Sequence, residues 1–187
     1  MVEIDPDVIA LRESFGVPDD KRLAIVQANA AAYLPAAEGD TDVLLLDGFD
    51  SKGIAPAFLS RSFYRAARNR LRPGGIGVAN FAGRRKYWSR HRALLNEAFE
   101  GRVQVGTVPG GDNHIAFAFA DAGFPLDWQL LEKRAGQLAE RSPLDFSAIM
   151  DSLREGAELR WAKAAAAKAS LLQKIQVTET CRKSTLT

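Results

Sequence analysis

The sequence predicts an α/β fold with a doubly wound, mostly parallel sheet, and three observations support this. Short apolar segments that suit strands alternate along the chain with longer segments of helical periodicity. One apolar segment, Val43 to Leu46, is continuous, as expected of a strand covered on both faces. The last two predicted strands, Val103–Val108 and His114–Ala120, flank a glycine-rich turn, which indicates an antiparallel hairpin.

The first third of the chain alternates strand and helix. Residues 1–4 suit the end of a strand, and Asp5 as N-cap with Pro6 in the first turn begins a helix that Gly16 ends. The next elements are a strand, a short helix closed by Pro35 and the central strand, at Leu23–Val26, Ala30–Leu34 and Asp42–Leu46.

The following elements repeat this alternation. We expect a loop, a helix, a strand begun after Pro73-Gly74-Gly75, and a second helix, at Gly48–Pro56, Phe58–Leu71, Ile76–Ala79 and Arg84–Phe99. Arg65, Arg68 and Arg70 cover the outer face of the first helix, and Trp88, Leu95 and Phe99 are candidate core residues of the second.

The C-terminal part is mostly helical, over Trp128–Arg141 and from Phe146 to about Gln176. The last ten residues are polar without periodicity, which is typical of a fraying end. We therefore predict a Rossmann-like domain at 1–125, a helical extension at 126–176 and a disordered tail at 177–187.

Composition narrows the class of protein. With 187 residues, 47% hydrophobic and 26% charged, the chain suits one globular domain. The net charge of +2 does not by itself indicate nucleic acid, and no apolar segment approaches the roughly 20 residues that a bilayer requires. One cysteine, Cys181, fits a reducing compartment, and the N-terminus lacks a signal-peptide pattern, so we expect a cytoplasmic protein. The two histidines offer no metal-ligand spacing, so we expect no metal.

Two carboxylates mark the candidate site. Asp47 follows the apolar segment directly, and Asp50 lies in the loop beyond it. Because ligands of open α/β sheets bind outside the carboxyl ends of the strands, this loop is where chemistry is expected. The simpler interpretation is that Asp47 only stabilises the turn, since Asp is a common turn residue.

The order of elements resembles the class I S-adenosylmethionine-dependent methyltransferase fold. The residues within these elements are similar to one branch of that fold, the polyamine aminopropyltransferases (spermidine and spermine synthases). The segments that carry the resemblance lie between residues 2 and about 120: Val2–Ile9, Val26–Ala30, Asp42–Asp50, Leu59–Tyr64, Leu71–Gly75 and Asn113–Phe117. The first and third of these are the most specific together, whereas Pro-Gly-Gly is common to methyltransferase-like folds.

The resemblance implies a role for each matching residue. Glu3 resembles the acidic residue that binds the nucleoside ribose, and Asn29-Ala30 resembles the pair that reads the adenine edge, with Asn in place of Asp. Asp47 resembles the general base, and Asp50 the second carboxylate that holds the amine. Glu3 and Asn29 also have structural alternatives: Glu3 as a surface carboxylate beside a helix start, and Asn29 as a cap. Tyr64 falls in a matching segment as a substrate contact, although packing is the commoner role of an aromatic residue on a helix.

The implied reaction needs such carboxylates. A polyamine nitrogen is protonated at neutral pH, so a positioned carboxylate must accept its proton as the nitrogen displaces the aminopropyl group from the sulfonium of decarboxylated S-adenosylmethionine. The sulfonium supplies the electrophile, so the resemblance implies a co-substrate and no tightly bound cofactor or metal.

The sequence also departs from the family pattern. The glycine-rich nucleoside loop and the central first strand of the family would precede residue 2, so we expect an N-terminally truncated sheet with unpaired edges and an uncovered apolar face. Ser51 and Asn80 stand where proline and glutamine are common in the family, which leaves the acceptor amine open.

Three other functions stay open. The chain could be a methyltransferase, or a non-catalytic remnant that pairs its free edge with another chain in a homo-oligomer or heteromer. The basic segment Arg84–Arg92 could contact nucleic acid phosphates, but a solvated helix face with Trp88 turned inward explains it more simply, so we expect a small-molecule amine as the partner.

Overall fold

The computed structural model describes residues 1–37, 40–50, 53–82, 85–108, 111, 113–121 and 124–157. By their contacts these residues form two compact units: Met1–Val103 with Ala116–Leu126, and Gln104–Ile115 with the segment that begins at Asp127. The segment Gln104–Ile115 thus groups with the C-terminal helices. The sequence instead predicts a single boundary, after residue 125. Of the predicted C-terminal helix, the part after residue 157 and the tail lie outside the described residues.

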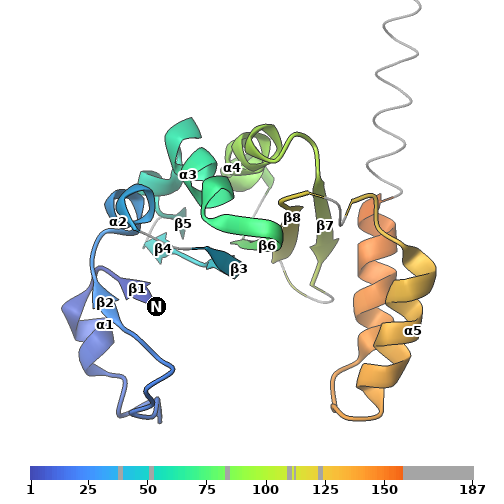
Figure 1. The fold of residues 1–187 in the computed structure, drawn as a ribbon, viewed down its shortest axis with the longest axis horizontal. Coiled ribbons are helices and arrows are strands. Elements are labelled where there is room, and N and C mark those ends of the chain that lie inside the picture. Colours follow the sequence, from blue (N-terminus) through green and yellow to red (C-terminus); the bar gives the residue numbers. More distant parts are fainter. Residues whose placement is uncertain are drawn as a thin grey trace, which may run out of the picture. The chain divides into compact units, whose positions relative to one another are not determined.

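Strands and helices alternate through the first unit, as predicted (Figure 1). In chain order the labelled elements are β1 (Val2–Glu3), α1 (Pro6–Ala10), β2 (Val26–Gln27), α2 (Ala30–Ala36), β3 (Thr41–Leu46), β4 (Phe49–Asp50), β5 (Gly53–Ile54), the 3₁₀ turn η1 (Pro56–Phe58), α3 (Arg61–Asn69), β6 (Leu71–Phe81), α4 (Arg85–Ala98), β7 (Val103–Thr107), β8 (His114–Phe119) and α5 (Trp128–Ala139). A further helix covers residues 146–157.

The main sheet has the strand order β3-β6-β8-β7, with β3 and β6 parallel. The backbone bonds from Val108 N–H to Asn113 O and from Phe119 N–H to Arg102 O close the predicted hairpin of β7 and β8. The fold is therefore α/β with a mixed sheet, as the sequence predicts.

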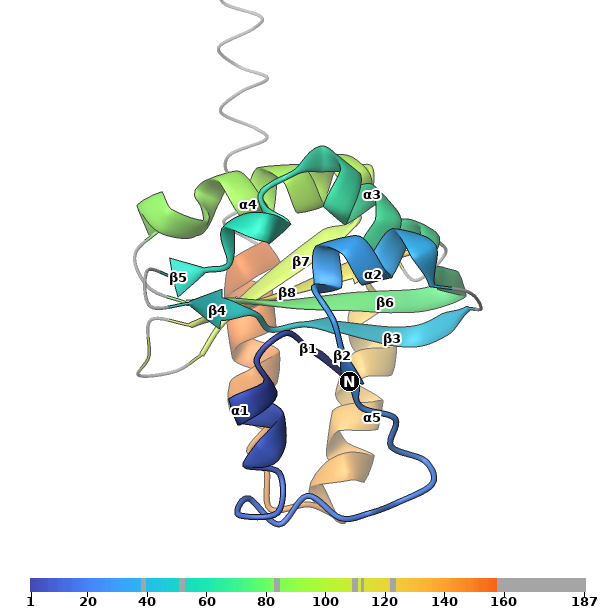
Figure 2. The same cartoon turned by 90° about the vertical axis from the view of Figure 1, so that its left-hand side faces the viewer.

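One face of this sheet carries α2, α3 and α4 (Figure 2). The parallel register pairs Leu44 with Gly77 and Leu46 with Ala79, and these residues share that face because side chains alternate along a strand. The ring of Phe99, at the end of α4, lies 3.3 Å from where a Cβ of Gly77 would be, so this strand has room only for small residues there. The core consists mainly of Phe63, Tyr64, Ala67, Leu71, Phe81, Trp88, Leu95 and Phe99, which include the three residues predicted for the second helix.

The opposite face of β3 is open within the described residues. Val43 is 53% exposed and Leu45 is 70% exposed, although both belong to the continuous apolar segment that suggested a fully covered strand. β3 is the end strand of its sheet, and β1 pairs only with β2, in parallel. The unpaired edge and uncovered apolar face expected from the sequence are therefore present in the described part of the chain.

The Pro-Gly-Gly segment lies inside a strand rather than before one. β6 begins at Leu71, opposite Thr41, and the next aligned pair is Ile76 opposite Val43, so 72–75 form a bulge. Gly74 adopts a φ of +79°, which favours glycine, and its N–H donates to Asp121. The observed helix α3 is shorter than the predicted 58–71, because the chain enters the sheet at Leu71.

Two further boundaries differ from the predictions. Pro35 does not close the helix as predicted: it lies inside α2, which continues to Ala36. The loop predicted at 48–56 contains a short antiparallel pair, β4 with β5. Short pairs of this kind leave no periodicity to detect, because each strand has two residues.

α3 and α4 are joined through a buried polar pair. The hydroxyl of Tyr64 lies 3.1 Å from Nδ1 of His91, and the two residues are 2% and 4% exposed. Burial raises the pKa of Tyr64, so its hydroxyl keeps its proton at any working pH. Burial, and secondly the charge of Arg90, lower the pKa of His91. The neutral imidazole is thus the form that the folded protein favours.

This pair predicts a pH-dependent stability. Because the pKa of His91 is lower in the folded than in the unfolded protein, the unfolded chain binds the proton more readily as the pH falls below about 6.5. The free energy of unfolding should therefore decrease from pH 7.5 to pH 5.0. His91→Gln, which can still bond Tyr64 but does not titrate, should show a smaller decrease in urea unfolding at the two pH values. An equal decrease in both proteins would contradict the assignment.

In the second unit, helix 146–157 lies directly against strand β7. Nε2 of Gln104, a residue only 2% exposed, donates to Leu153 O at 2.8 Å, and Ser152 Oγ donates to Thr107 O at 2.6 Å. A Cβ on Gly156 would lie 1.7 Å from Val105 O, so only glycine permits this approach. None of the helices among the described residues is long and apolar enough to cross a membrane.

Candidate active site

Asp47 and Asn80 meet at the carboxyl ends of two neighbouring strands. The register that pairs Leu46 with Ala79 places the next residue of each strand side by side. Asn80 Nδ2 donates to Asp47 Oδ1 at 3.2 Å. Asp47 is exposed, and within the described residues its second oxygen has no hydrogen-bond partner, so it can accept a proton or a hydrogen bond from a ligand.

The other polar atom of Asn80 is unsatisfied. Its Oδ1 is buried and finds no donor among the described residues. A buried acceptor without a partner costs about 1–3 kcal/mol. The acceptors that a ligand can reach are the exposed carboxylate oxygens, and a donor-rich group such as an ammonium is complementary to them.

The loop after Asp47 is held by aromatic packing. The Phe58 ring lies 2.5 Å from where a Cβ of Gly48 would be, and it stacks on Phe63 at 4.4 Å between ring centres. Ala55 N–H donates to Gly48 O at 3.1 Å. This packing requires glycine between the two carboxylates and directs the chain into β4.

Asp50 ends β4 and pairs with Gly53 across the short hairpin. It is exposed and lies three residues beyond Asp47, at the same end of the sheet. Ser51, the departure noted beside it, lies outside the described residues. A role for Asp50 in holding an amine stays a prediction.

Glu3 lies in the separate β1–β2 pair, and Asn29 and Ala30 follow β2 at the start of α2. Glu3 ends β1, and its Oε1 accepts from the N–H groups of Ile4 and Asp5 at 2.7 and 2.9 Å. Asn29 Oδ1 accepts from Ala31 N–H at 2.9 Å as the N-cap of α2, which begins at Ala30.

The structural alternatives for Glu3 and Asn29 are therefore both present, and one oxygen of each side chain is committed locally. Within the described residues no hydrogen bond joins Glu3 or Asn29 to Asp47. Their roles in binding a nucleoside stay predictions.

The side chain of Tyr64 is not exposed to the solvent around the loop that follows Asp47. It is 2% exposed and directs its hydroxyl to His91. A substrate contact by Tyr64 stays untested by any bound ligand, and the burial of its side chain argues against it.

Asn80 is the residue that the predicted site omits. The strand-end position was visible in the sequence, but its proximity to Asp47 depends on the register of β3 with β6, which the bulge at 72–75 offsets. The described residues hold no group of three His, Cys, Asp or Glu side chains that could bind a metal ion.

Two curated proteins similar to this chain have the same name. Over 157 residues the chain is 34% identical to the polyamine aminopropyltransferase of Chromobacterium violaceum, covering 82% of this chain and 60% of that protein. Over 155 residues it is 34% identical to the polyamine aminopropyltransferase of Neisseria meningitidis serogroup B, covering 82% and 59%. The chain thus spans about 60% of the length of these relatives. No protein-family model matches the chain.

Solved structures show the same fold at lower identity. A spermidine synthase in complex with the transition-state analogue AdoDATO matches with a TM-score of 0.62 and 21% identity, over 81% of this chain and 56% of that one. Human methyltransferase-like protein 13 in complex with SAH matches with a TM-score of 0.62 and 23% identity, over 77% and 71%. By sequence and by its methyltransferase-type fold, this chain is a homologue of the polyamine aminopropyltransferases.

Proposed function

We propose that the protein containing this chain transfers an aminopropyl group from decarboxylated S-adenosylmethionine to a small amine. The observation that carries the proposal is the pair of Asp47 and Asn80 at the strand ends, in a chain whose relatives are named aminopropyltransferases. The exposed carboxylates of Asp47 and Asp50 suit a cationic amine.

In the proposed step the amine nitrogen attacks the aminopropyl carbon bonded to the sulfonium. The C–N bond forms, the C–S bond breaks and its electron pair stays on sulfur, which becomes a neutral thioether in methylthioadenosine. Asp47 accepts the proton that the nitrogen loses. Asn80 holds Oδ1 of Asp47, which leaves the other carboxylate oxygen for that proton.

Asp50 adds a second negative charge near the amine and favours its positively charged form on binding. In this proposal Glu3 binds the ribose hydroxyls, and Asn29 with Ala30 borders the adenine. The co-substrate itself carries the electrophilic carbon, so the protein residues have only to orient the two substrates and remove a proton.

The test incubates the purified protein with decarboxylated S-adenosylmethionine and, in turn, putrescine, cadaverine and agmatine. Mass spectrometry should find methylthioadenosine and the aminopropylated amine in equal amounts. A parallel reaction with S-adenosylmethionine separates methyl transfer, which would release S-adenosylhomocysteine instead. Formation of that product alone would reject aminopropyl transfer.

Replacing Asn80 should lower the turnover of the protein more than its stability. Asn80→Ala removes the hydrogen bond to Asp47 and also the unsatisfied oxygen, so we expect turnover about 10–100-fold lower with little loss of stability. Steady-state kinetics and thermal unfolding of the same samples measure both. A variant that keeps full turnover would show that Asn80 does not position Asp47.

A further inference from the structure

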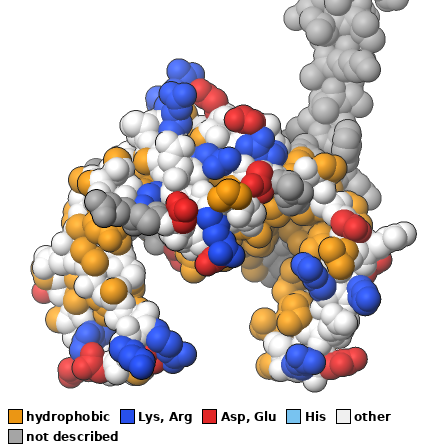
Figure 3. All heavy atoms as spheres, viewed as in Figure 1, with side chains coloured by type: hydrophobic (Ala, Val, Ile, Leu, Met, Phe, Trp, Pro, Cys, Tyr) orange, Lys and Arg blue, Asp and Glu red, His pale blue; other side chains and the backbone are white. Residues whose placement is uncertain are grey.

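An arginine-rich groove lies on the helical face of the sheet, over α3 and between α2 and α4. Its volume is about 1400 Å³, and among the described residues Arg61, Arg65, Arg70 and Arg90 line it together with one acidic residue, Asp40. Figure 3 shows several Lys and Arg side chains over α3 and α4, with Asp and Glu side chains between them. None of the residues in the proposed active site lines this groove.

The arginines differ in how far they are already engaged. Arg61 pairs with Glu97 at 3.1 Å, and Arg70 donates to Ala37 O at 2.8 Å. Arg65 and Arg90 are exposed and have no acidic partner or hydrogen bond among the described residues. Their guanidinium groups are therefore available to an anion.

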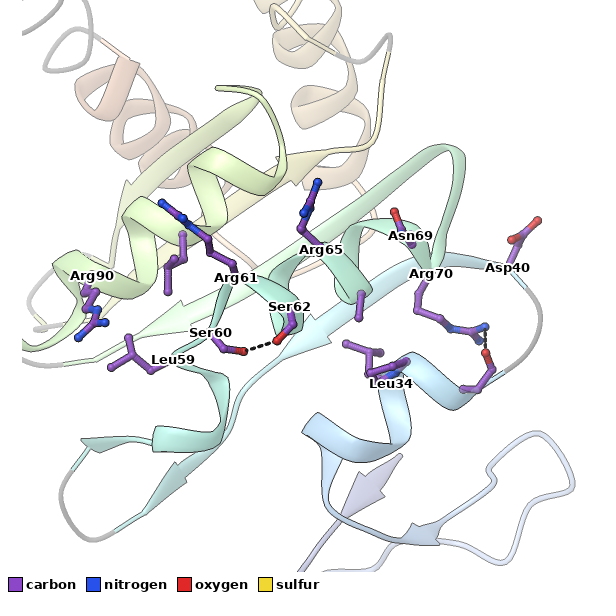
Figure 4. A pocket seen from close by; sticks show the side chains of 14 residues that line it. Leu34, Asp40, Leu59, Ser60, Arg61, Ser62, Arg65, Asn69, Arg70 and Arg90 are labelled. Carbon is purple, nitrogen blue, oxygen red and sulfur yellow. Dashed lines mark hydrogen bonds between the residues drawn. The ribbon is translucent and has the colours of Figure 1, made fainter.

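The remaining lining supplies polar groups and little else that could recognise a base. Ser60 Oγ and Ser62 Oγ lie 3.1 Å apart, and Arg90 lies near Ser60 at one end of the groove while Asp40 lies at the other (Figure 4). Among the described residues no aromatic side chain lines the groove, so these residues offer no stacking platform. Leu34, Leu59 and Leu94 give it a limited apolar floor.

The groove continues along α3. Arg61, Arg65 and Arg68 are spaced i, i+4 and i+7, which places them on one face of the helix. Arg61 and Arg65 also line a second, smaller groove of about 430 Å³, which Arg68 and Glu97 border. The first groove alone exceeds the roughly 300–1,000 Å³ of ordinary small-molecule sites, so an extended polyanion fits it better than a single phosphate.

We propose that this groove binds the phosphodiester backbone of a single-stranded nucleic acid without reading its bases. Guanidinium groups pair with phosphate oxygens in a bidentate manner, and the serine hydroxyls add donors. The sequence alone suggested phosphate contacts only for Arg84–Arg92. The structure buries Trp88 and His91 of that segment and brings Arg90 to the arginines of α3.

Fluorescence anisotropy with labelled 16-nucleotide oligo-U and oligo-A at 50–200 mM salt tests the proposal. We expect both to bind with similar affinity, which falls as salt rises. Arg65→Ala with Arg90→Ala should weaken binding roughly tenfold. The slope of log K against log salt should fall in magnitude by about 1.4, because each phosphate contact on a single strand contributes about 0.7.

The matched control is Arg134→Ala with Arg141→Ala, two exposed arginines of the second unit, which removes the same charge. It should bind as the unchanged protein does. Equal loss in both double variants, a preference for one base, or tighter binding of poly-glutamate than of either oligonucleotide would overturn the proposal. Aminopropyl transfer does not enter this readout, so the two proposals succeed or fail separately.

Discussion

Replacing Asp47 by asparagine is expected to lower the rate of aminopropyl transfer by about 10²–10⁴-fold, the usual contribution of a general base. The amide is nearly the same size as the carboxylate and its oxygen can still accept from Asn80, but it cannot take a proton at neutral pH. Because Asp47 is exposed, the melting temperature should change little.

Asp42→Asn is the matched control for this variant. Asp42 lies on the same strand at its opposite end, where it pairs with Arg72, so the substitution makes the same chemical change away from the site. It should leave turnover within about twofold, since isolated surface ion pairs contribute little. Near-normal turnover of Asp47→Asn would reject Asp47 as the base, and a common loss in both variants would point to strand β3 itself.

The second large effect is expected at Gly156. Its alanine variant would place a Cβ 1.7 Å from Val105 O, so helix 146–157 must move away from β7. That movement strains the hydrogen bond from the buried Gln104 side chain to Leu153 O, the shorter of the two that its Nε2 donates. Overpacking and lost hydrogen bonding of this kind cost about 1–3 kcal/mol each, and the melting temperature should fall by roughly 5–15 °C.

Gly136→Ala provides the control with the opposite sign. Gly136 lies in α5, and a Cβ there meets nothing within 4 Å. Alanine in an exposed helix interior is favoured over glycine by about 1 kcal/mol, so this variant should unfold at a higher temperature. Thermal unfolding followed by circular dichroism measures both variants. If both raised the melting temperature, the close docking of the helix on β7 would be wrong.

The sequence predicts the order of elements well because strand and helix periodicities are local properties. Trp88 and Phe99 are buried as their positions indicate, and Asp47 lies at its strand end. Features that depend on partners were harder to foresee. Leu71 is apolar and could end a helix or begin a strand, and only its pairing with Thr41 decides for the strand.

The residues of the candidate site show the same difference between local features and features that depend on partners. Asn29 satisfies its cap within two residues, a contact that a sequence motif does not separate from ligand binding. Tyr64 matches a family segment, but its partner His91 comes from another helix, 27 positions further along. Asn80 stands out in the sequence only as a departure from the family pattern, because its contact with Asp47 depends on a neighbour on an adjacent strand.

The small β1–β2 sheet has a consequence for the energetics of the proposed nucleoside binding. Each of its strands has two residues, and α1 buries none of its side chains. Such segments open locally at a small fraction of the global free energy, so their amide hydrogens exchange early while those of β6 stay protected. If Glu3 binds the nucleoside as proposed, part of the intrinsic binding affinity is spent on ordering this segment, and the nucleoside should slow exchange at β1 far more than in the core.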